Sequence, residues 1–209
     1  MSYVLFYAPG AASLVVHWML VELGVAFGAE RVNLKAGDQH SPAFLQLNPA
    51  GRVPVLLVDD QAFTESAALV MWLAERHPQA QLAPAVGDDR RGRWLETMIY
   101  LTNTVSSAMR DWLYAERDGE PADADAVRRL ARRRIESAWE RLNVMLADGR
   151  MHLLGEEMTT ADLLAVMLML WSRNMPRPAT TWENVGPYVK RMCSRPGFIE
   201  VCRREGLTK

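Results

Sequence analysis

The sequence predicts an N-terminal α/β domain over residues 1–78, a linker over residues 79–89, and an all-helical domain over residues 90–209. The first segment alternates strand and helix patterns, the linker contains helix breakers, and the remainder follows a 3.6-residue apolar period. A chain of 209 residues is long enough for two modest domains. Its hydrophobic content of 49% and charged content of 23% are typical of a folded globular protein.

The first domain begins with a strand, a helix and a second strand. Residues 3–7, "YVLFY", form a short apolar run that ends before Pro9-Gly10. Apolar residues with helical spacing occupy residues 11–24, which end at a glycine, and residues 26–34 predict the second strand. Because a helix connects these two strands, we expect them to pair in parallel.

A hairpin and a helix complete the expected βαβαββα order. Residues 53–60, "VPVLLVDD", predict the third strand, and Asp59-Asp60 form a turn into a short fourth strand, residues 61–63. A hairpin makes these two strands antiparallel. Residues 64–77, "TESAALVMWLAERH", predict a helix that ends before a proline.

Three helices dominate the second domain. Apolar stripes with helical spacing cover residues 94–113 and residues 127–145. The third helix begins at "MTTADLL", where Thr159 and Asp162 resemble a capping box with Asp in place of Glu or Gln. Since the following run is apolar on all sides, we expect this helix at the centre of the domain.

The second of these helices carries a basic run, "RRLARRR", over residues 128–134. Glu136 and Glu140 follow it closely, and the formal net charge of the chain is -1. We therefore interpret the run as a solvated helix face rather than a nucleic-acid patch. A near-neutral chain also has little electrostatic reason to bind nucleic acid or an anionic membrane, so neither partner is expected.

The start of the chain and its longest apolar run bear on the expected compartment. The start, "MSYVLFYAPG", lacks the basic and long apolar regions of a secretory signal, and the apolar run at residues 163–171 is too short to span a bilayer. A cytoplasmic location is the default. There Cys193 and Cys202 are expected to stay reduced, and no Cys/His cluster has metal-ligand spacing, so no metal is expected.

The segment "NPAGRVPVLLVDD" carries the first candidate binding feature. Pro54 stands at the entrance of the third strand, where it cannot donate a ladder hydrogen bond. A cis Val53-Pro54 bond would present the N–H and C=O of Val53 outward, where a peptide-like ligand could pair with them. The alternative is a trans proline that merely starts a strand.

The segment "TES" carries the second candidate feature. Glu65 and Ser66 lie at the N-terminus of an apolar helix, where free N–H groups and the helix dipole attract a carboxylate. Their side chains could hold an ammonium group and another carboxylate oxygen. The alternative is simple capping of the helix.

Taken together, these motifs resemble the cytosolic glutathione S-transferase family over nearly the whole chain. The stretches "FYAPGAAS", "NPAGRVPVLLVDD" and "FTESAALVMWLAERHP" are most similar to its bacterial beta class. The resemblance implies a thioredoxin-like first domain and a helical second domain that forms the second-substrate side of the cleft. It implies that Val53 pairs with the cysteine of glutathione across a cis bond to Pro54, and that Glu65 and Ser66 hold its γ-glutamyl group. The T-x-x-D box is implied to nucleate the second domain.

Three positions depart from the beta-class pattern. That class has Pro-Gly-Ala-Cys-Ser, whereas the cysteine position here is Ala12. The beta class also places an Asn and a His facing the thiol, and those positions hold Glu96 and Asn103. Cysteine-dependent redox chemistry is therefore not expected, while the glutathione-binding motifs are retained.

Activation of the glutathione thiol then requires other groups. A thiol has a pKa of about 8.5, and lowering it by two units takes about 2.7 kcal/mol. A helix N-terminus supplies ~0.3–1 kcal/mol, up to ~2 when partly buried, so one hydrogen-bond donor is also needed. Ser13, at the start of the first helix, and Tyr7, at the end of the first strand, are the candidate catalytic residues. The alternatives are a helix cap for Ser13, a core ring for Tyr7, and activation by no side chain.

We therefore expect a cytoplasmic, homodimeric glutathione transferase that uses glutathione as co-substrate and adds its thiolate to a small electrophile. Arg52, together with Lys35 and His40, flanks the expected site and could meet the glycine carboxylate of glutathione, or could be a solvated loop residue. One alternative is a glutathione- or ligand-binding protein with little turnover. Another is a regulatory interaction protein of the same fold, which would not need the V-P and E-S motifs.

Overall fold

The computed structural model describes residues 2–207. The chain divides into two compact units. The first contains the residues up to Gln81 together with the C-terminal segment from Ser194. The second runs from Leu82 to Cys193.

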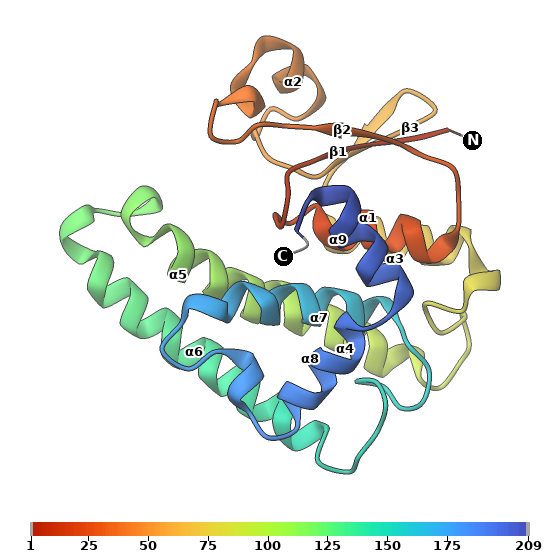
Figure 1. Ribbon diagram of the computed structural model, residues 1–209, viewed down its shortest axis with the longest axis vertical. Coiled ribbons are helices and arrows are strands. Elements are labelled where there is room, and N and C mark those ends of the chain that lie inside the picture. Colours follow the sequence, from red (N-terminus) through yellow and green to blue (C-terminus); the bar gives the residue numbers. More distant parts are fainter. Residues whose placement is uncertain (1, 208–209) are drawn as a thin grey trace. The chain divides into compact units, whose positions relative to one another are not determined.

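The first unit is built on a four-stranded sheet with helices on both faces (Figure 1). Its strands are β1 (Tyr3–Tyr7), β2 (Gly28–Arg31), β3 (Val55–Val58) and β4 (Gln61–Phe63). Its helices are α1 (Leu14–Leu23), η1 (Asp38–His40), α2 (Pro42–Leu47), α3 (Ser66–Arg76), η2 (Pro78–Ala80) and α9 (Pro196–Glu205). The strand order is β2-β1-β3-β4.

The pairing of the strands confirms the predicted topology. β1 and β2 are parallel, whereas β3 is antiparallel to both β1 and β4. Asp59 and Asp60, between β3 and β4, have φ of 46° and 69°, which is the backbone of a tight hairpin turn. The third strand starts at Val55 rather than at the predicted residue 53, because Pro54 has no N–H to contribute to the ladder.

Side chains that alternate in direction along the strands form two apolar layers, one on each face of the sheet. Leu5 and Leu56 are directly opposite each other and fully buried. The neighbouring pair, Phe6 and Val55, instead belongs to a cluster with Phe44 of α2. Successive side chains of a strand point to opposite faces, so α2 covers one face of the sheet while α1 and α3 cover the other (Figure 1).

The C-terminal helix corrects the expected domain boundary. The sequence suggested that all residues after position 90 form one helical domain, but the segment from Ser194 belongs to the first unit. α9 lies alongside α1 (Figure 1), where the rings of Trp18 and Phe198 are 4.8 Å apart and Arg195 forms an ion pair with Glu22. These contacts join segments that are far apart in sequence, so local patterns gave no sign of them.

The second unit is helical throughout its regular structure. Its elements are α4 (Arg91–Tyr100), η3 (Leu101–Ser106), α5 (Ser107–Asp118), η4 (Pro121–Asp123), α6 (Ala124–Met145), α7 (Thr160–Trp171), η5 (Ser172–Asn174), η6 (Ala179–Thr181) and α8 (Val185–Cys193). Among the described residues, no helix is long and apolar enough to cross a membrane.

The predicted capping box at the start of α7 is confirmed. The hydroxyl of Thr159 accepts a hydrogen bond from the backbone N–H of Ala161, and the carboxylate of Asp162 accepts one from the N–H of Thr159 at 2.8 Å. α7 is buried from Thr160 to Met169, which matches the expectation of a central helix.

The predicted long helix over residues 94–113 is interrupted. Residues 101–106 form one stretch of π-helix between α4 and α5. The hydroxyl of Thr102 donates to the carbonyl oxygens of Met98 and Ile99, both at 3.0 Å. Such a side chain competes with the backbone for helix carbonyls and favours local unwinding.

Part of the basic run on α6 is held in ion pairs. Arg132 contacts Glu136 on the same helix at 2.6 Å, and Arg128 contacts Glu116 of α5 at 3.0 Å. Arg129 and Arg133 are exposed. The run therefore forms a solvated helix face, as interpreted from the sequence.

Candidate functional site

Three candidate segments lie at one end of the sheet. Phe6, near the end of β1, pairs with Val55 at the start of β3, and the next residue of β3 pairs with Phe63 at the end of β4. The register therefore places the turn after β1, the Val53-Pro54 bond and the start of α3 at the same end of the sheet.

The turn between β1 and α1 is tightly fixed by the backbone. Gly10 has φ of 69°, a conformation that glycine adopts without strain, and the N–H of Ala11 donates to the carbonyl of Ala8 at 3.1 Å. Within the described chain, no residue accepts a hydrogen bond from the N–H of Ala12 or Ser13. Ala12 is half-buried and precedes α1, so its N–H remains available to an anion at the helix N-terminus, whereas Ser13 is fully buried.

The side chain of Ser13 is occupied within the turn. It is fully buried, donates to the carbonyl of Ala8 at 3.2 Å and accepts from the N–H of the same residue at 3.1 Å. A hydroxyl has one proton to donate. The geometry therefore does not support the expected donation from this hydroxyl to a ligand sulfur, and it resembles the alternative, a side chain that stabilises the helix start.

Tyr7 lies in the core at the end of β1. It is 9% exposed, and its ring meets the ring of His17 edge-on with centroids 5.0 Å apart. This position agrees with the core-ring alternative, and it leaves Tyr7 next to the turn.

The Val53-Pro54 bond is cis, as expected from the sequence. Val53 is half-buried against the cluster around Phe44, and β3 begins only at Val55. Within residues 2–207, the N–H and C=O of Val53 have no hydrogen-bond partner. An extended ligand can pair with these two groups as an added strand would.

Glu65 and Ser66 form the start of α3. Glu65 is exposed and has φ of 67° and ψ of 100°, a strained backbone for a residue with a side chain. The hydroxyl of Ser66 donates to the carbonyl of Ala12 at 2.9 Å, which joins the start of α3 to the turn before α1. The two helix N-termini are thereby brought together.

Arg52 lies on the loop before the cis bond. Its side chain is exposed, and its carbonyl accepts a hydrogen bond from the amide of Asn48 at 2.7 Å. Lys35 and His40 are likewise exposed. The structure brings none of these three side chains into a described contact with the turn, and their roles stay predictions.

Comparison with known proteins identifies the family. Residues 1–75 match the family model of the glutathione S-transferase N-terminal domain. The solved structure of a sphingomonad glutathione S-transferase complexed with glutathione is 30% identical, covers 98% of this chain and 100% of its own, and superposes with a TM-score of 0.84. The chain belongs to the glutathione S-transferase family.

Further relatives agree with this assignment. A bacterial beta-class glutathione S-transferase from Sphingomonas chungbukensis is 29% identical over 98% of this chain and 100% of its own, with a TM-score of 0.85. The glutathione S-transferase GstA of Escherichia coli O157:H7 is 27% identical over 205 residues, or 97% of this chain and 98% of that protein.

Two positions that depart from the beta-class pattern lie in the second unit. The carboxylate of Glu96 pairs with Arg93 at 2.6 Å and with Arg141 at 3.3 Å, and these partners lower its pKa. Asn103 is exposed within the π-helical stretch. Glu96 is thus engaged by arginines of its own unit.

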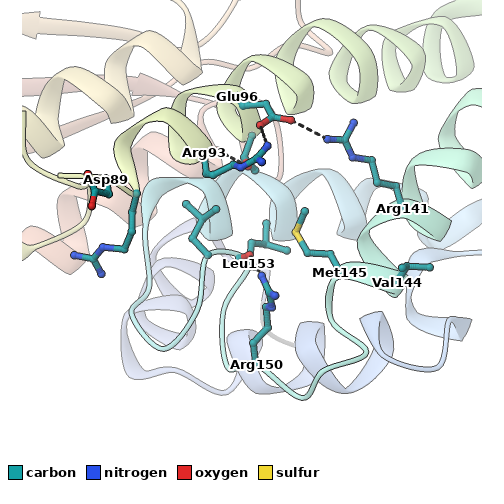
Figure 2. A pocket seen from close by; sticks show the side chains of 11 residues that line it. Asp89, Arg93, Glu96, Arg141, Val144, Met145, Arg150 and Leu153 are labelled. Atoms are coloured by element: carbon teal, nitrogen blue, oxygen red, sulfur yellow. Dashed lines mark hydrogen bonds and ion pairs between the residues drawn. The ribbon is translucent and has the colours of Figure 1, made fainter. Parts of the chain in front are cut away.

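Glu96 also lines an open cavity of about 540 Å³ in the second unit (Figure 2). It is lined by four arginines, Arg90, Arg93, Arg141 and Arg150, and by apolar residues such as Met145 and Leu153. Each of these four arginines pairs with a carboxylate.

Sequence reasoning missed one polar cluster beside the turn. Nδ1 of His17 lies 2.9 Å from Oε1 of Glu205, and Oε2 of that carboxylate accepts from the N–H of Gly10. The two side chains are 188 residues apart. The only local signal was a histidine within the otherwise apolar stretch of α1.

Proposed function

We propose that this glutathione transferase holds glutathione at this end of the sheet in its first unit and stabilises the thiolate for attack on a small electrophile. The observation that carries the proposal is that backbone groups with no partner in the described chain meet at this end of the sheet: the N–H and C=O of Val53 and the N–H of Ala12. The sphingomonad relative, which is complexed with glutathione, supports the choice of ligand.

Each part of glutathione has a complementary group. The backbone of its cysteine pairs with the backbone of Val53, next to Pro54, as an antiparallel strand would. Its γ-glutamyl carboxylate binds the N-terminus of α3 at Ser66, and the exposed Glu65 carboxylate holds the ammonium group. Arg52 remains the candidate for the glycine carboxylate.

The thiolate is stabilised by backbone rather than by a hydroxyl. The N–H of Ala12 lies at the positive end of α1, next to the carbonyl that Ser66 holds. Ser13 is fully buried and its hydroxyl is bonded to Ala8, so it supports the turn instead of contacting the thiolate. Tyr7 is retained as the second catalytic candidate.

One observation favours a second candidate function, a glutathione- or ligand-binding protein with little turnover. The hydroxyl of Ser13 is turned into the protein, and Ala12 stands where the resemblance to the beta class leads us to expect a cysteine. Backbone donors and a dipole alone stabilise a thiolate less than they do with an added side-chain donor. The retained Val53-Pro54 and Glu65-Ser66 pairs argue against the regulatory alternative.

We propose that the protein acts on a small electrophile as a homodimer in the cytoplasm, as expected from the sequence. Sedimentation that gives a species of 23.6 kDa at micromolar concentration would contradict the dimer.

Calorimetry with glutathione, run beside an activity panel of model electrophiles, tests the function. Binding with turnover of at least one electrophile supports the transferase. Binding without turnover supports the second candidate, and the absence of binding contradicts both.

A further inference from the structure

The end of α9 places a buried carboxylate against the turn that precedes α1. Glu205 is 4% exposed, and its two oxygens have different partners. Oε1 lies 2.9 Å from Nδ1 of His17, and Oε2 accepts the N–H of Gly10 at 2.9 Å. One side chain therefore contacts both the turn and the first helix, on the side where α9 runs along α1 (Figure 1).

The surroundings of this pair are mostly apolar. His17 is fully buried, its ring meets Phe27 edge-on at 5.5 Å, and its Nε2 has no hydrogen-bond partner among the described residues. The nearby titratable and charged groups are Tyr7 against the imidazole, Cys202 beside the carboxylate, and Arg204 stacked on Phe27.

Attachment of α9 does not require this pair. Burying two polar groups is costly, and apolar residues of similar volume often stabilise a fold as well or better. The contact between Trp18 and Phe198 already joins α1 to α9 without any polar group. A buried carboxylate that accepts a turn N–H instead fixes where that N–H points.

The segment from Gly10 to Ser13 is in fact held at three points. Ser13 bonds to Ala8, Ser66 bonds to the carbonyl of Ala12, and Glu205 bonds to Gly10. Between these points lies the N–H of Ala12. The field of a helix terminus acts over short distances, so small rotations of this N–H change its effect on a bound anion.

Resting on the proposed function, we propose that Glu205, oriented by His17, is a positioning residue for the thiolate. It holds Gly10 so that the N–H of Ala12 faces the sulfur of glutathione. The C-terminal helix thereby takes part in thiol activation without contacting the ligand.

Three substitutions in the full-length protein test this role. Glu205→Leu keeps the volume and removes both hydrogen bonds, so the bound thiol pKa should rise by about one unit and kcat should fall about tenfold. The dissociation constant for glutathione should change less than about threefold. Glu205→Gln retains an acceptor for Gly10 and a donor for Nδ1, and should restore most of the wild-type behaviour. Glu200→Gln removes a carboxylate that pairs with Arg203 and Arg204 on the surface of the same helix, and should match wild type.

The outcomes separate this role from a structural one. A folded Glu205→Leu protein with the wild-type thiol titration and kcat would overturn the proposal, as would a Glu205→Gln protein that behaves like Glu205→Leu.

If Glu205→Leu does not fold, hydrogen exchange of the Gly10 amide in wild type decides. Strong protection supports a lasting hydrogen bond from the Gly10 N–H to Glu205, and exchange at the rate of an exposed loop overturns it. A wild-type protein that binds no glutathione would refute the proposed function, while the exchange measurement would still decide whether Glu205 holds Gly10.

Discussion

The hydroxyl of Ser66 donates to the carbonyl of Ala12 at 2.9 Å, and this bond links the N-termini of α3 and α1. Ser66→Ala removes the link that holds the start of α3, the proposed site of the γ-glutamyl carboxylate, against the turn before α1. We expect glutathione affinity to fall by about threefold to tenfold, since a typical hydrogen bond contributes ~0.5–1.5 kcal/mol. Calorimetry measures the loss. An affinity equal to wild type would show that the helix N-terminus binds the carboxylate without the hydroxyl.

Glu65 combines exposure with a strained backbone, which suggests that its position serves binding rather than stability. Glu65→Ala should weaken glutathione binding by about tenfold or more, because a charge-assisted hydrogen bond is lost. The melting temperature should stay near that of wild type. Asp60→Ala is the matched control, because Asp60 is also acidic, exposed and at positive φ, but lies in the hairpin turn. Equal effects of the two substitutions on affinity would contradict the role of Glu65.

The buried carboxylate of Asp162 depends on several donors, including the hydroxyl of Tyr188 at 2.8 Å. Burial raises the pKa of Asp162, and the hydrogen bonds from Leu153, Thr159 and Tyr188 oppose that rise. Tyr188→Phe removes one of these bonds and should lower the free energy of unfolding by about 1–3 kcal/mol.

This effect should depend on pH with a definite sign. Because the folded state holds the Asp162 proton to higher pH than the unfolded chain does, this residue's contribution is most favourable in acid and declines as pH rises above about 4. Removing the Tyr188 donor raises the folded pKa further, so the loss should be larger at neutral pH than in acid. Urea denaturation at neutral and at acidic pH measures the loss in free energy of unfolding, and Tyr114→Phe, at an exposed tyrosine, is the control. A loss that is larger in acid would contradict the assignment.

The two cysteines should be dispensable for activity. Burial, reinforced by the Glu205 carboxylate, raises the pKa of the Cys202 thiol, so this thiol is a poor nucleophile at neutral pH. The double substitution Cys193→Ser and Cys202→Ser should retain glutathione-dependent activity. Loss of that activity with an intact fold would show that a C-terminal thiol reaches the site.

Local patterns were sufficient to predict much of the first unit. The apolar run of β1, the turn at Asp59-Asp60 and the proline at position 54 each specify their structure through neighbouring residues. The capping box at Thr159 was predictable for the same reason, since both partners lie within one helical turn.

The features that the sequence did not reveal depend on contacts between distant segments. Ser13 was expected to face a ligand, but its hydroxyl is bonded to Ala8, a geometry that the order of residues does not specify. The pairing of His17 with Glu205 and the return of α9 to the first unit span most of the chain. The π-helical stretch contains Thr102, whose hydroxyl bonds to helix carbonyls, and the apolar period of the sequence gives no sign of such a bond.

Thiolate absorbance of the glutathione complex, titrated against pH, tests the central claim most directly. If the backbone at the start of α1 stabilises the thiolate, the bound thiol of the wild-type protein titrates about one unit below the free value of about 8.5. Tyr7→Phe should leave that titration nearly unchanged. A bound thiol that titrates like free glutathione would contradict the account, and a rise of about one unit in Tyr7→Phe would assign the stabilisation to the phenol instead.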